Sequence, residues 1–120
     1  MTAAKVLYES EEILSAPPQM LTLMLYDGAI GFLSDGVDAL ASGQTGEFQT
    51  YNQKAQNIIR ELMVTLDMKY DLAKQLMALY DYMEYRLNNA REQNIADPLV
   101  EVRKLMSELR EAWAQAAATI

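Results

Sequence analysis

The chain has 120 residues, a formal net charge of −7, and neither cysteine nor histidine. This length predicts one domain with a substantial core, while the missing residue types exclude disulfides, cysteine- or histidine-ligated metals and acid–base catalysis by histidine. The negative charge argues against nucleic acid or an anionic membrane as the main partner, and no apolar run approaches the ~20 residues of a membrane span. The N-terminus lacks the apolar segment of a signal peptide, so we expect a cytoplasmic protein without cofactor or metal.

Residues 1–17 precede the first predicted helix as a separate segment. The prolines at 17 and 18 divide this segment from the helix, because a residue before proline avoids helical backbone. Its apolar side chains are too numerous for a solvated tail, and we expect a short helix or extended arm that rests on the rest of the chain as a lid. The side chains expected to hold this lid in place are Leu7, Tyr8, Ile13 and Leu14.

The first helix contains two Asp-Gly pairs, at residues 27–28 and 35–36, which taken alone favour hairpin turns. The apolar residues around them have helical spacing and do not alternate as a strand requires. We therefore predict one helix over residues 18–41. Its expected core face comprises Leu21, Leu25, Ala29 and Phe32, together with Gly28, where another helix could approach closely.

Three more helices come after it, joined by short loops. Asp71 is the expected N-cap of the third helix, and Asp97 is the expected N-cap of the fourth, followed by Pro98 at the first helical position. Each helix has an apolar core face, which in the third includes Leu72 and Leu79. Together they predict an all-α fold, an antiparallel four-helix bundle over residues 18–118 with helices at 18–41, 47–66, 71–92 and 98–118.

The first helix carries more apolar surface than a bundle helix needs. A second stripe, on the side away from the core face, comprises Leu23, Tyr26, Ile30, Leu33 and Val37, and the third helix has a weaker one at Tyr70, Ala73, Met77 and Tyr80. One interpretation is that the arm covers the surplus or that the first helix is simply central. The other is a hydrophobic groove that receives helices of another chain.

Catalytic interpretations of a helical bundle have less support. A di-iron site needs Glu-x-x-His motifs, and there is no histidine. A small helical mutase would grip a dicarboxylate with arginines, and the candidates are Arg60, Arg86, Arg91, Arg103 and Arg110. Each is expected on the polar side of its helix, where a solvated charge is the ordinary interpretation. A non-catalytic bundle that self-associates through the second stripe is the further alternative, which leaves open a weak homodimer.

Several motifs resemble those of one known family. The run APPQMLTLMLYDGAIGFL at residues 16–33 resembles the signature of the flagellar secretion chaperone family, FliS, with its leucine/methionine run followed by Leu-Tyr-Asp-Gly-Ala-Ile. Residues 52–62 match its N-x-x-A-Q-x-I-I-x-E-L pattern, residues 79–83 its L-Y-D-Y-M and residues 109–113 its L-R-E-A-W. Tyr8 is similar to the family's N-terminal tyrosine. The matches span nearly the whole chain in order.

The resemblance implies a cytoplasmic export chaperone, not an enzyme. Such a protein binds the disordered C-terminal segment of flagellin, prevents premature polymerisation and delivers its client to the cytoplasmic domain of the flagellar type III export gate. The family's N-terminal segment can cover part of the groove and move aside for the client. Combining this with the apolar stripes, we expect partner contact at Leu23, Tyr26, Ile30, Val37, Tyr70 and Met77.

Three positions depart from the family pattern. Pro17 stands where the family has serine, which removes a helix N-cap and is expected to stiffen or reposition the lid. Gly31 and Gly36 stand where the family more often has lysine and alanine. Glycine within a helix costs about 1 kcal/mol relative to alanine, and neither position shows a packing reason for it. We expect them to weaken the first helix.

Overall fold

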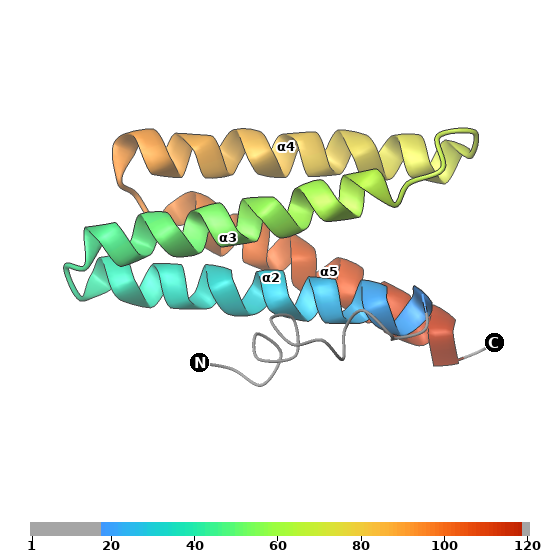
Figure 1. The fold of residues 1–120 in the computed structure, drawn as a ribbon, viewed down its shortest axis with the longest axis horizontal. Coiled ribbons are helices and arrows are strands. Elements are labelled where there is room, and N and C mark those ends of the chain that lie inside the picture. The colour runs from blue at the N-terminus through green and yellow to red at the C-terminus, as the bar shows by residue number, and fades with distance from the viewer. Residues whose placement is uncertain (1–17, 119–120) are drawn as a thin grey trace.

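A computed structural model describes residues 18–118, which form four helices (Figure 1). The predicted ranges differ from the observed bounds by at most two residues, and the all-α fold is confirmed. The N-terminal segment, with the four expected lid residues, lies outside the described part of the chain. The helices are α2 (Pro18–Ala41), α3 (Thr45–Val64), α4 (Asp71–Gln93) and α5 (Asp97–Ala118).

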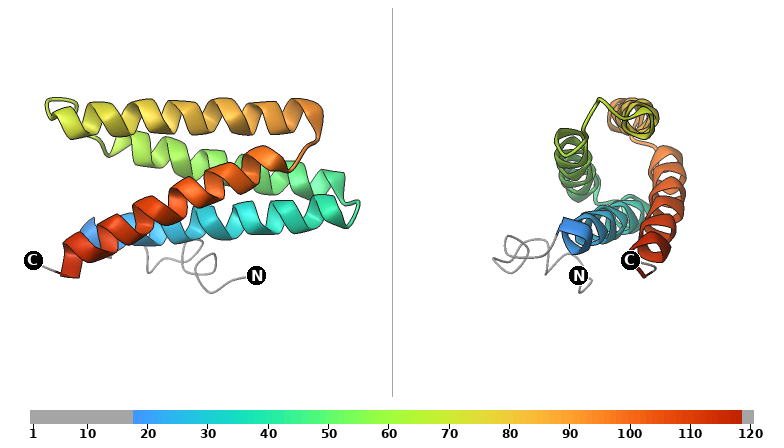
Figure 2. Two further views of the ribbon diagram at one scale, coloured as in Figure 1. Left: turned by 180° about the vertical axis from the view of Figure 1, so that it is seen from behind. Right: turned by 90° about the vertical axis from the view of Figure 1, so that its right-hand side faces the viewer.

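The helices run antiparallel in chain order, and α2 is the centre of their packing. It packs closely on both α3 and α5, whereas α4 packs less closely on those same two helices. In the end-on view of Figure 2, α3 and α5 lie on either side between α2 and α4. The other view shows α5 running obliquely, from the end of α4 towards the start of α2 (Figure 2). The second half of α5 therefore follows α2 instead of α4.

The connection between α2 and α3 is only three residues long because Gly43 caps α2. Gly43 has a φ of 76°, a left-handed conformation that glycine adopts without strain. Its N–H donates to the Leu40 carbonyl at 3.0 Å, and the N–H of Gln44 donates to the Ala39 carbonyl at 2.8 Å. This pair of bonds is a Schellman motif. The Gln44 carbonyl then accepts the first bond of α3, from Phe48, so α3 begins two residues earlier than predicted.

Two expected caps are wrong by one residue. Asp71 is not the N-cap of α4 but its first helical residue, and Tyr70 occupies the cap position in extended backbone without a side-chain hydrogen bond. Asp97 is likewise the first residue of α5. The carbonyl of Ala96 accepts the early bonds of α5, from Leu99 at 2.9 Å and Val100 at 3.2 Å. Both acidic side chains remain in the first turn, where the helix dipole favours negative charge.

The second stripe of α2 is less exposed than the sequence suggested. Tyr26 and Leu33 are fully buried in the core cluster, at 0% exposure, and Ile30 and Val37 are partly buried against it. Because α2 contacts α3 on one side and α5 on the other, more than one face of it is covered. Of the two interpretations of the stripe, the central position of this helix accounts for these four residues.

Gly36 has a packing role after all. A Cβ at this position would lie 2.7 Å from Cδ2 of Leu99 on α5 and 3.5 Å from Cβ of Tyr51 on α3. Leu99 is fully buried. The missing side chain therefore lets both neighbours of α2 approach it, and the expectation that Gly36 lacks a packing reason is wrong.

The five arginines considered for a substrate grip are engaged by other helices. Arg110 of α5 pairs with Asp27 of α2 at 2.9 Å. Asp27 of α2 therefore faces α5 instead of open solvent. The other contacts are Arg86 with Glu101 at 2.6 Å, Arg60 with Glu84 at 2.8 Å, Arg103 with Ser34 at 3.4 Å, and Arg91 with Gln53 at 2.9 Å and Gln56 at 2.8 Å.

No described helix combines the length and the apolar character needed to cross a membrane.

Candidate partner-binding cleft

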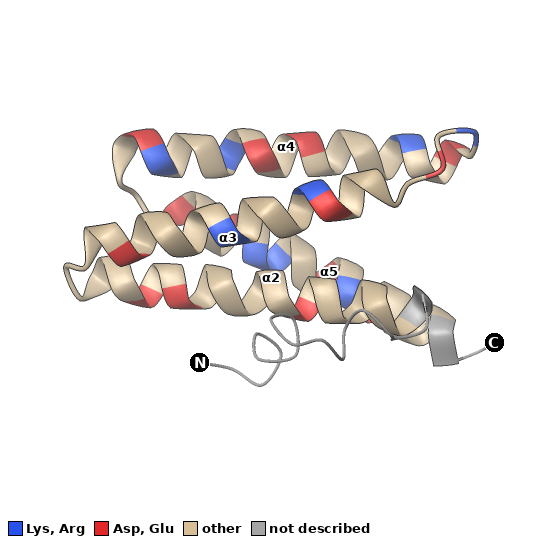
Figure 3. Ribbon diagram, viewed as in Figure 1, with Lys and Arg blue, Asp and Glu red and all other residues tan. Residues whose placement is uncertain are grey.

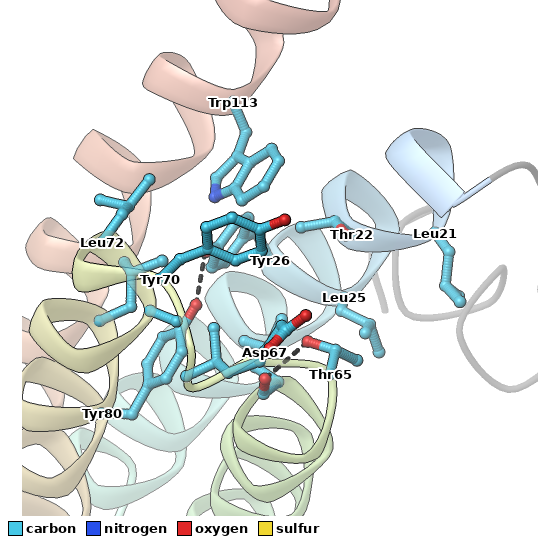
Figure 4. Close-up of a pocket in the computed structure, with 14 residues that line it drawn as sticks. Leu21, Thr22, Leu25, Tyr26, Thr65, Asp67, Tyr70, Leu72, Tyr80 and Trp113 are labelled. Carbon is cyan, nitrogen blue, oxygen red and sulfur yellow. Dashed lines mark hydrogen bonds between the residues drawn. The ribbon is translucent and has the colours of Figure 1, made fainter.

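The first compartment of an apolar cleft opens at the end of the bundle where α3 turns into α4 (Figure 4). All four described helices contribute to it, and its volume is about 390 Å³. Leu21 and Leu25 of α2 and Leu62 near the end of α3 line one part of it, while the α3–α4 connection, α4 and α5 supply the remaining wall. The lining residues are Leu21, Thr22, Leu25, Tyr26, Leu62, Thr65, Leu66, Asp67, Tyr70, Leu72, Ala73, Leu76, Tyr80 and Trp113.

A second compartment of about 230 Å³ lies between α4 and α5. Leu72, Leu76 and Trp113 line both compartments and so separate them. The second compartment exists because α5 diverges from the first half of α4 as it follows α2. Its lining is Leu72, Leu76, Leu109, Ala112, Trp113 and Ala116. We call the two compartments together the cleft.

Several apolar side chains are exposed at this end of the molecule. Leu72 was expected in the core but is 64% exposed, and Ala73 beside it is buried instead. The reason is that Leu72 projects between α4 and the departing α5, where no helix covers it. Val64, Met68 and Tyr70, from the end of α3 and the turn, are also exposed. A contiguous exposed apolar surface is typical of a site that binds another chain.

The floor of the cleft is a pair of buried tyrosines. The hydroxyls of Tyr26 on α2 and Tyr80 on α4 share a hydrogen bond of 2.6 Å across the bundle (Figure 4). Burial is the main reason that the pKa of each phenol lies above its ordinary 10.0. For Tyr26, hydrogen bonds with Tyr80 and Trp113 offset part of the rise in pKa. Both hydroxyls are therefore neutral and satisfied at physiological pH.

Charge contributes little to the cleft. Among the described residues that line it, only Asp67 is charged, and its carboxylate lies 3.4 Å from the ammonium of Lys69. The charged residues of α2 are all acidic, and most lie away from this end (Figure 3). Within the described residues, no three acidic side chains gather as metal ligands. The cleft is suited to apolar side chains, not to an ion or a charged metabolite.

The structure brings only part of the expected contact set to the cleft. Tyr70 lines it and is 60% exposed, whereas Tyr26 forms its floor and is fully buried. Met77 lies on α4, one turn beyond Ala73, and is partly buried. The other three expected residues, Leu23, Ile30 and Val37, are partly buried on α2 and line neither compartment.

Other lining residues were missed because their helical spacing marks them as core. Leu66, Leu76, Leu109 and Trp113 each fall on the inward stripe of their predicted helix, and each is only partly buried. Periodicity gives the direction of a side chain but not whether a neighbouring helix reaches it. The divergence of α5 from α4 decides that, and no single-helix pattern encodes it.

Comparison with known proteins identifies the family. A family profile described as "Flagellar protein FliS" matches residues 1–120. The chain is 37% identical to the flagellar secretion chaperone FliS of Bacillus subtilis over 109 residues, covering 91% of this chain and 82% of that one. It is 38% identical to the protein of the same name from Salmonella typhimurium over 122 aligned positions, covering 93% and 84%. For the Escherichia coli protein the identity is 36% over 105 residues, covering 84% and 76%.

The chain belongs to the FliS family. It is thus a member of a family of non-catalytic secretion chaperones, and the mutase interpretation is dropped. Two of the FliS-like motifs meet in the cleft, because the tyrosines of LYDGAI and LYDYM are the hydrogen-bonded Tyr26 and Tyr80. A third, LREAW, places Arg110 against Asp27 and Trp113 on the wall of the cleft.

Proposed function

We propose that this protein is a cytoplasmic export chaperone that holds the disordered C-terminal segment of flagellin. Bound, that segment is kept from polymerising prematurely and is presented to the cytoplasmic domain of the flagellar type III export gate. Membership of the FliS family supports the proposal. The observation that carries it is the two-compartment apolar cleft, which ends in exposed Leu72 and Tyr70.

Binding in this cleft is recognition of a helix by a groove. An amphipathic client helix would place apolar side chains on either side of Leu72 and Leu76, one row in each compartment. The client is unstructured when free, so it loses conformational entropy as it orders, and part of the interaction energy offsets that cost. The residues proposed for contact are Leu72, Leu76 and Trp113 in addition to Tyr70 and Met77.

The role of the α2 residues is a separate part of the proposal. Leu23, Ile30 and Val37 remain partly exposed, so they could extend the client path along α2 beyond the cleft. Tyr26 is fully buried, so we propose that it supports the floor of the cleft through its bond to Tyr80 and does not touch the client. The affinity of a Leu23→Asp variant for the client tests this extension. Weaker binding would mean that the client path continues along α2, and unchanged binding would mean that it ends at the cleft.

Calorimetric titration with a flagellin C-terminal segment, with helix content followed by circular dichroism, tests the proposal. We expect binding with a negative heat-capacity change and a gain of helix. Leu72→Asp should weaken binding by about tenfold or more, because an unpaired carboxylate would be buried by the client. Leu72 is largely exposed in the free protein, so folding should survive the change.

Val100→Asp is the matched control, since Val100 is an exposed apolar residue of α5 that lines neither compartment. It should bind as the unmodified protein does. Absence of binding to flagellin, or equal weakening by the two variants, would contradict the proposal.

Self-association through the same cleft is the second candidate. It is favoured by the exposed apolar residues Val64, Met68, Tyr70 and Leu72. Sedimentation equilibrium distinguishes it from client binding. A dimer that Leu72→Asp dissociates, without flagellin binding, would establish self-association as the use of this surface.

A further inference from the structure

The hydrogen bonds and ion pairs that join α4 to the other described helices begin only at Tyr80, near the middle of the helix. We call these contacts the polar anchors of α4. Residues 80–91 bond to every other described helix through side chains or carbonyls, whereas residues 71–79 make no hydrogen bond or ion pair with α2, α3 or α5 among the described residues. The one ion pair there, Lys74 with Asp71, is within α4. From Tyr80 onward the anchors are Tyr80 on Tyr26, Tyr82 and Arg86 on Glu101, Glu84 on Arg60, the Leu87 carbonyl on Asn52, Asn88 on Gln56, and Arg91 on Gln53 and Gln56.

The part of α4 without polar anchors is also the part with an open space on each side. Its inward residues are Ala73, Leu76 and Leu79, of which only Ala73 is buried. The first compartment lies on its α2–α3 side and the second on its α5 side. Residues 71–79 are therefore held by a few apolar contacts, and such segments open at a lower free energy than the rest of a fold.

Tyr80 is the first polar anchor and the one that crosses the bundle. It reaches Tyr26 on the diagonally opposite helix, and both rings are buried. Two satisfied hydroxyls in a low-dielectric interior resist separation, because each would be left without a partner. Because Tyr80 is the next residue of the same helix, outward movement of residues 71–79 strains this bond, and movement beyond Tyr80 breaks it.

We propose that residues 71–79 are a movable wall of the cleft, and that the Tyr26–Tyr80 hydrogen bond is the stop that limits its movement. The wall turns outward to join the two compartments around an entering amphipathic helix, and the bond keeps the remainder of α4 on the bundle. The identity of that helix as the flagellin segment rests on the proposed function. The wall and its stop are properties of the free protein.

Hydrogen exchange of the full chain without client tests the wall directly. Amides of residues 75–79 should exchange faster than those of residues 84–90 in the same helix. In Tyr80→Phe, exchange at 75–79 should rise by roughly three- to tenfold, the factor expected for the loss of one hydrogen bond. Tyr82→Phe is the matched control, because it removes the exposed bond to Glu101 and should leave 75–79 unchanged.

A double variant protects this test against misfolding. Tyr26→Phe with Tyr80→Phe removes both hydroxyls, keeps both rings and leaves no unpaired phenol, so the bundle should fold. It should show the same faster exchange at 75–79. Uniform exchange along α4 in the unmodified protein, or an unchanged 75–79 in both variants, would overturn the proposal.

The second experiment measures the rate of client binding, with the fluorescence of Trp113 as its probe. Trp113 is the single tryptophan of the chain and lines both compartments, so its fluorescence reports entry of the flagellin segment. If the wall must open, the double variant should associate several-fold faster, because its open form is more populated. Faster exchange with an unchanged association rate would overturn the role of the wall in client entry. No binding by any variant would reject the flagellin proposal, while the exchange result would still decide whether the wall moves.

Discussion

Gly36 and Gly46 are both helical, but their surroundings differ. A Cβ at Gly46 would meet nothing within 4 Å, whereas one at Gly36 would collide with Leu99. We expect Gly46→Ala to stabilise the protein by up to about 1 kcal/mol, through helix propensity and a less flexible unfolded chain. Gly36→Ala should gain nothing, because Leu99 must move from a packed site.

Urea denaturation of the two alanine variants measures this difference. Gly36→Val should be less stable than the unmodified protein by about 1–3 kcal/mol, as in other overpacked cores. An equal gain in the two alanine variants would mean that Leu99 repacks freely and that Gly36 has no packing role.

Because of the Tyr26–Tyr80 pair, we expect the stability of the protein to vary with pH in the alkaline range. Burial raises the folded-state pKa of Tyr26 and Tyr80 above the 10.0 that they have when unfolded. The stability that this shift contributes is complete below pH 10 and is lost as pH rises through the raised values, because the unfolded chain releases protons first. We expect unfolding free energy to fall above pH 10, and to fall less in the variant with phenylalanine at both positions. Denaturation curves at several pH values check this, and identical slopes for the two proteins would contradict it.

At the residue scale, sequence patterns identified most core positions but not those at the edges of each apolar face. Leu25, Ala29 and Phe32 are buried as their spacing predicts. Tyr26 was placed outside and Leu72 inside, and both are reversed. Their exposure depends on α5, which covers one flank of α2 and leaves the start of α4 uncovered. That path is a property of the assembled helices.

The α3–α4 interface illustrates the element scale, because its two halves have different chemistry. Near the cleft it is apolar, and further along it is a row of amides. Asn52 is fully buried and donates to the Leu87 carbonyl at 2.9 Å, and its own oxygen accepts from Gln56 at 3.3 Å. The polar half fixes the register of the two helices, since a shift along the axis would leave buried amides without partners.

Removing one amide should therefore be costly. We expect Asn52→Ala to destabilise the protein by about 2 kcal/mol, through loss of the bonds to the Leu87 carbonyl and from the Gln56 amide and through the cavity that remains. Asn57→Ala is the control, since Asn57 is exposed on the same helix and, within the part of the chain that the structure describes, its side chain accepts only from Gln53. Its stability should stay within about 0.5 kcal/mol of the original. Thermal or urea unfolding measures both, and equal stability of the two variants would mean that the row of amides does not set the register.

Helix ends were predictable to within two residues because their signals are local. Gly43 in left-handed backbone stops α2, and Asn94 does the same for α4 with a φ of 52°. Which half of a helix lines a cleft cannot be predicted from such local signals. The polar residues of the motif at residues 52–62 could be recognised from the sequence. Their role in a buried row of amides could not, because it depends on α4 packing beside them.

On the scale of the whole molecule, an apolar cleft opens at one end of the bundle, and polar side-chain contacts join the helices further along it. The chain carries a net charge of −7, yet of the described residues that line the cleft only Asp67 is charged, with Lys69 beside it. A client held by apolar contacts should bind independently of that charge. Electrostatic attraction would instead weaken as the Debye length falls from about 10 Å at 0.1 M salt to about 3 Å at 1 M.

We therefore expect the affinity for the flagellin segment to be unchanged or slightly higher at about 1 M sodium chloride than at about 0.1 M. Calorimetry at both salt concentrations measures it, and Asp67→Asn tests the one lining charge and should bind like the original. The unfolding free energy of the free protein at both concentrations is the control, since it reports any change in the bundle itself. A tenfold loss of affinity in high salt, with stability unchanged, would place the client on the charged surfaces of the helices and leave the cleft to self-association.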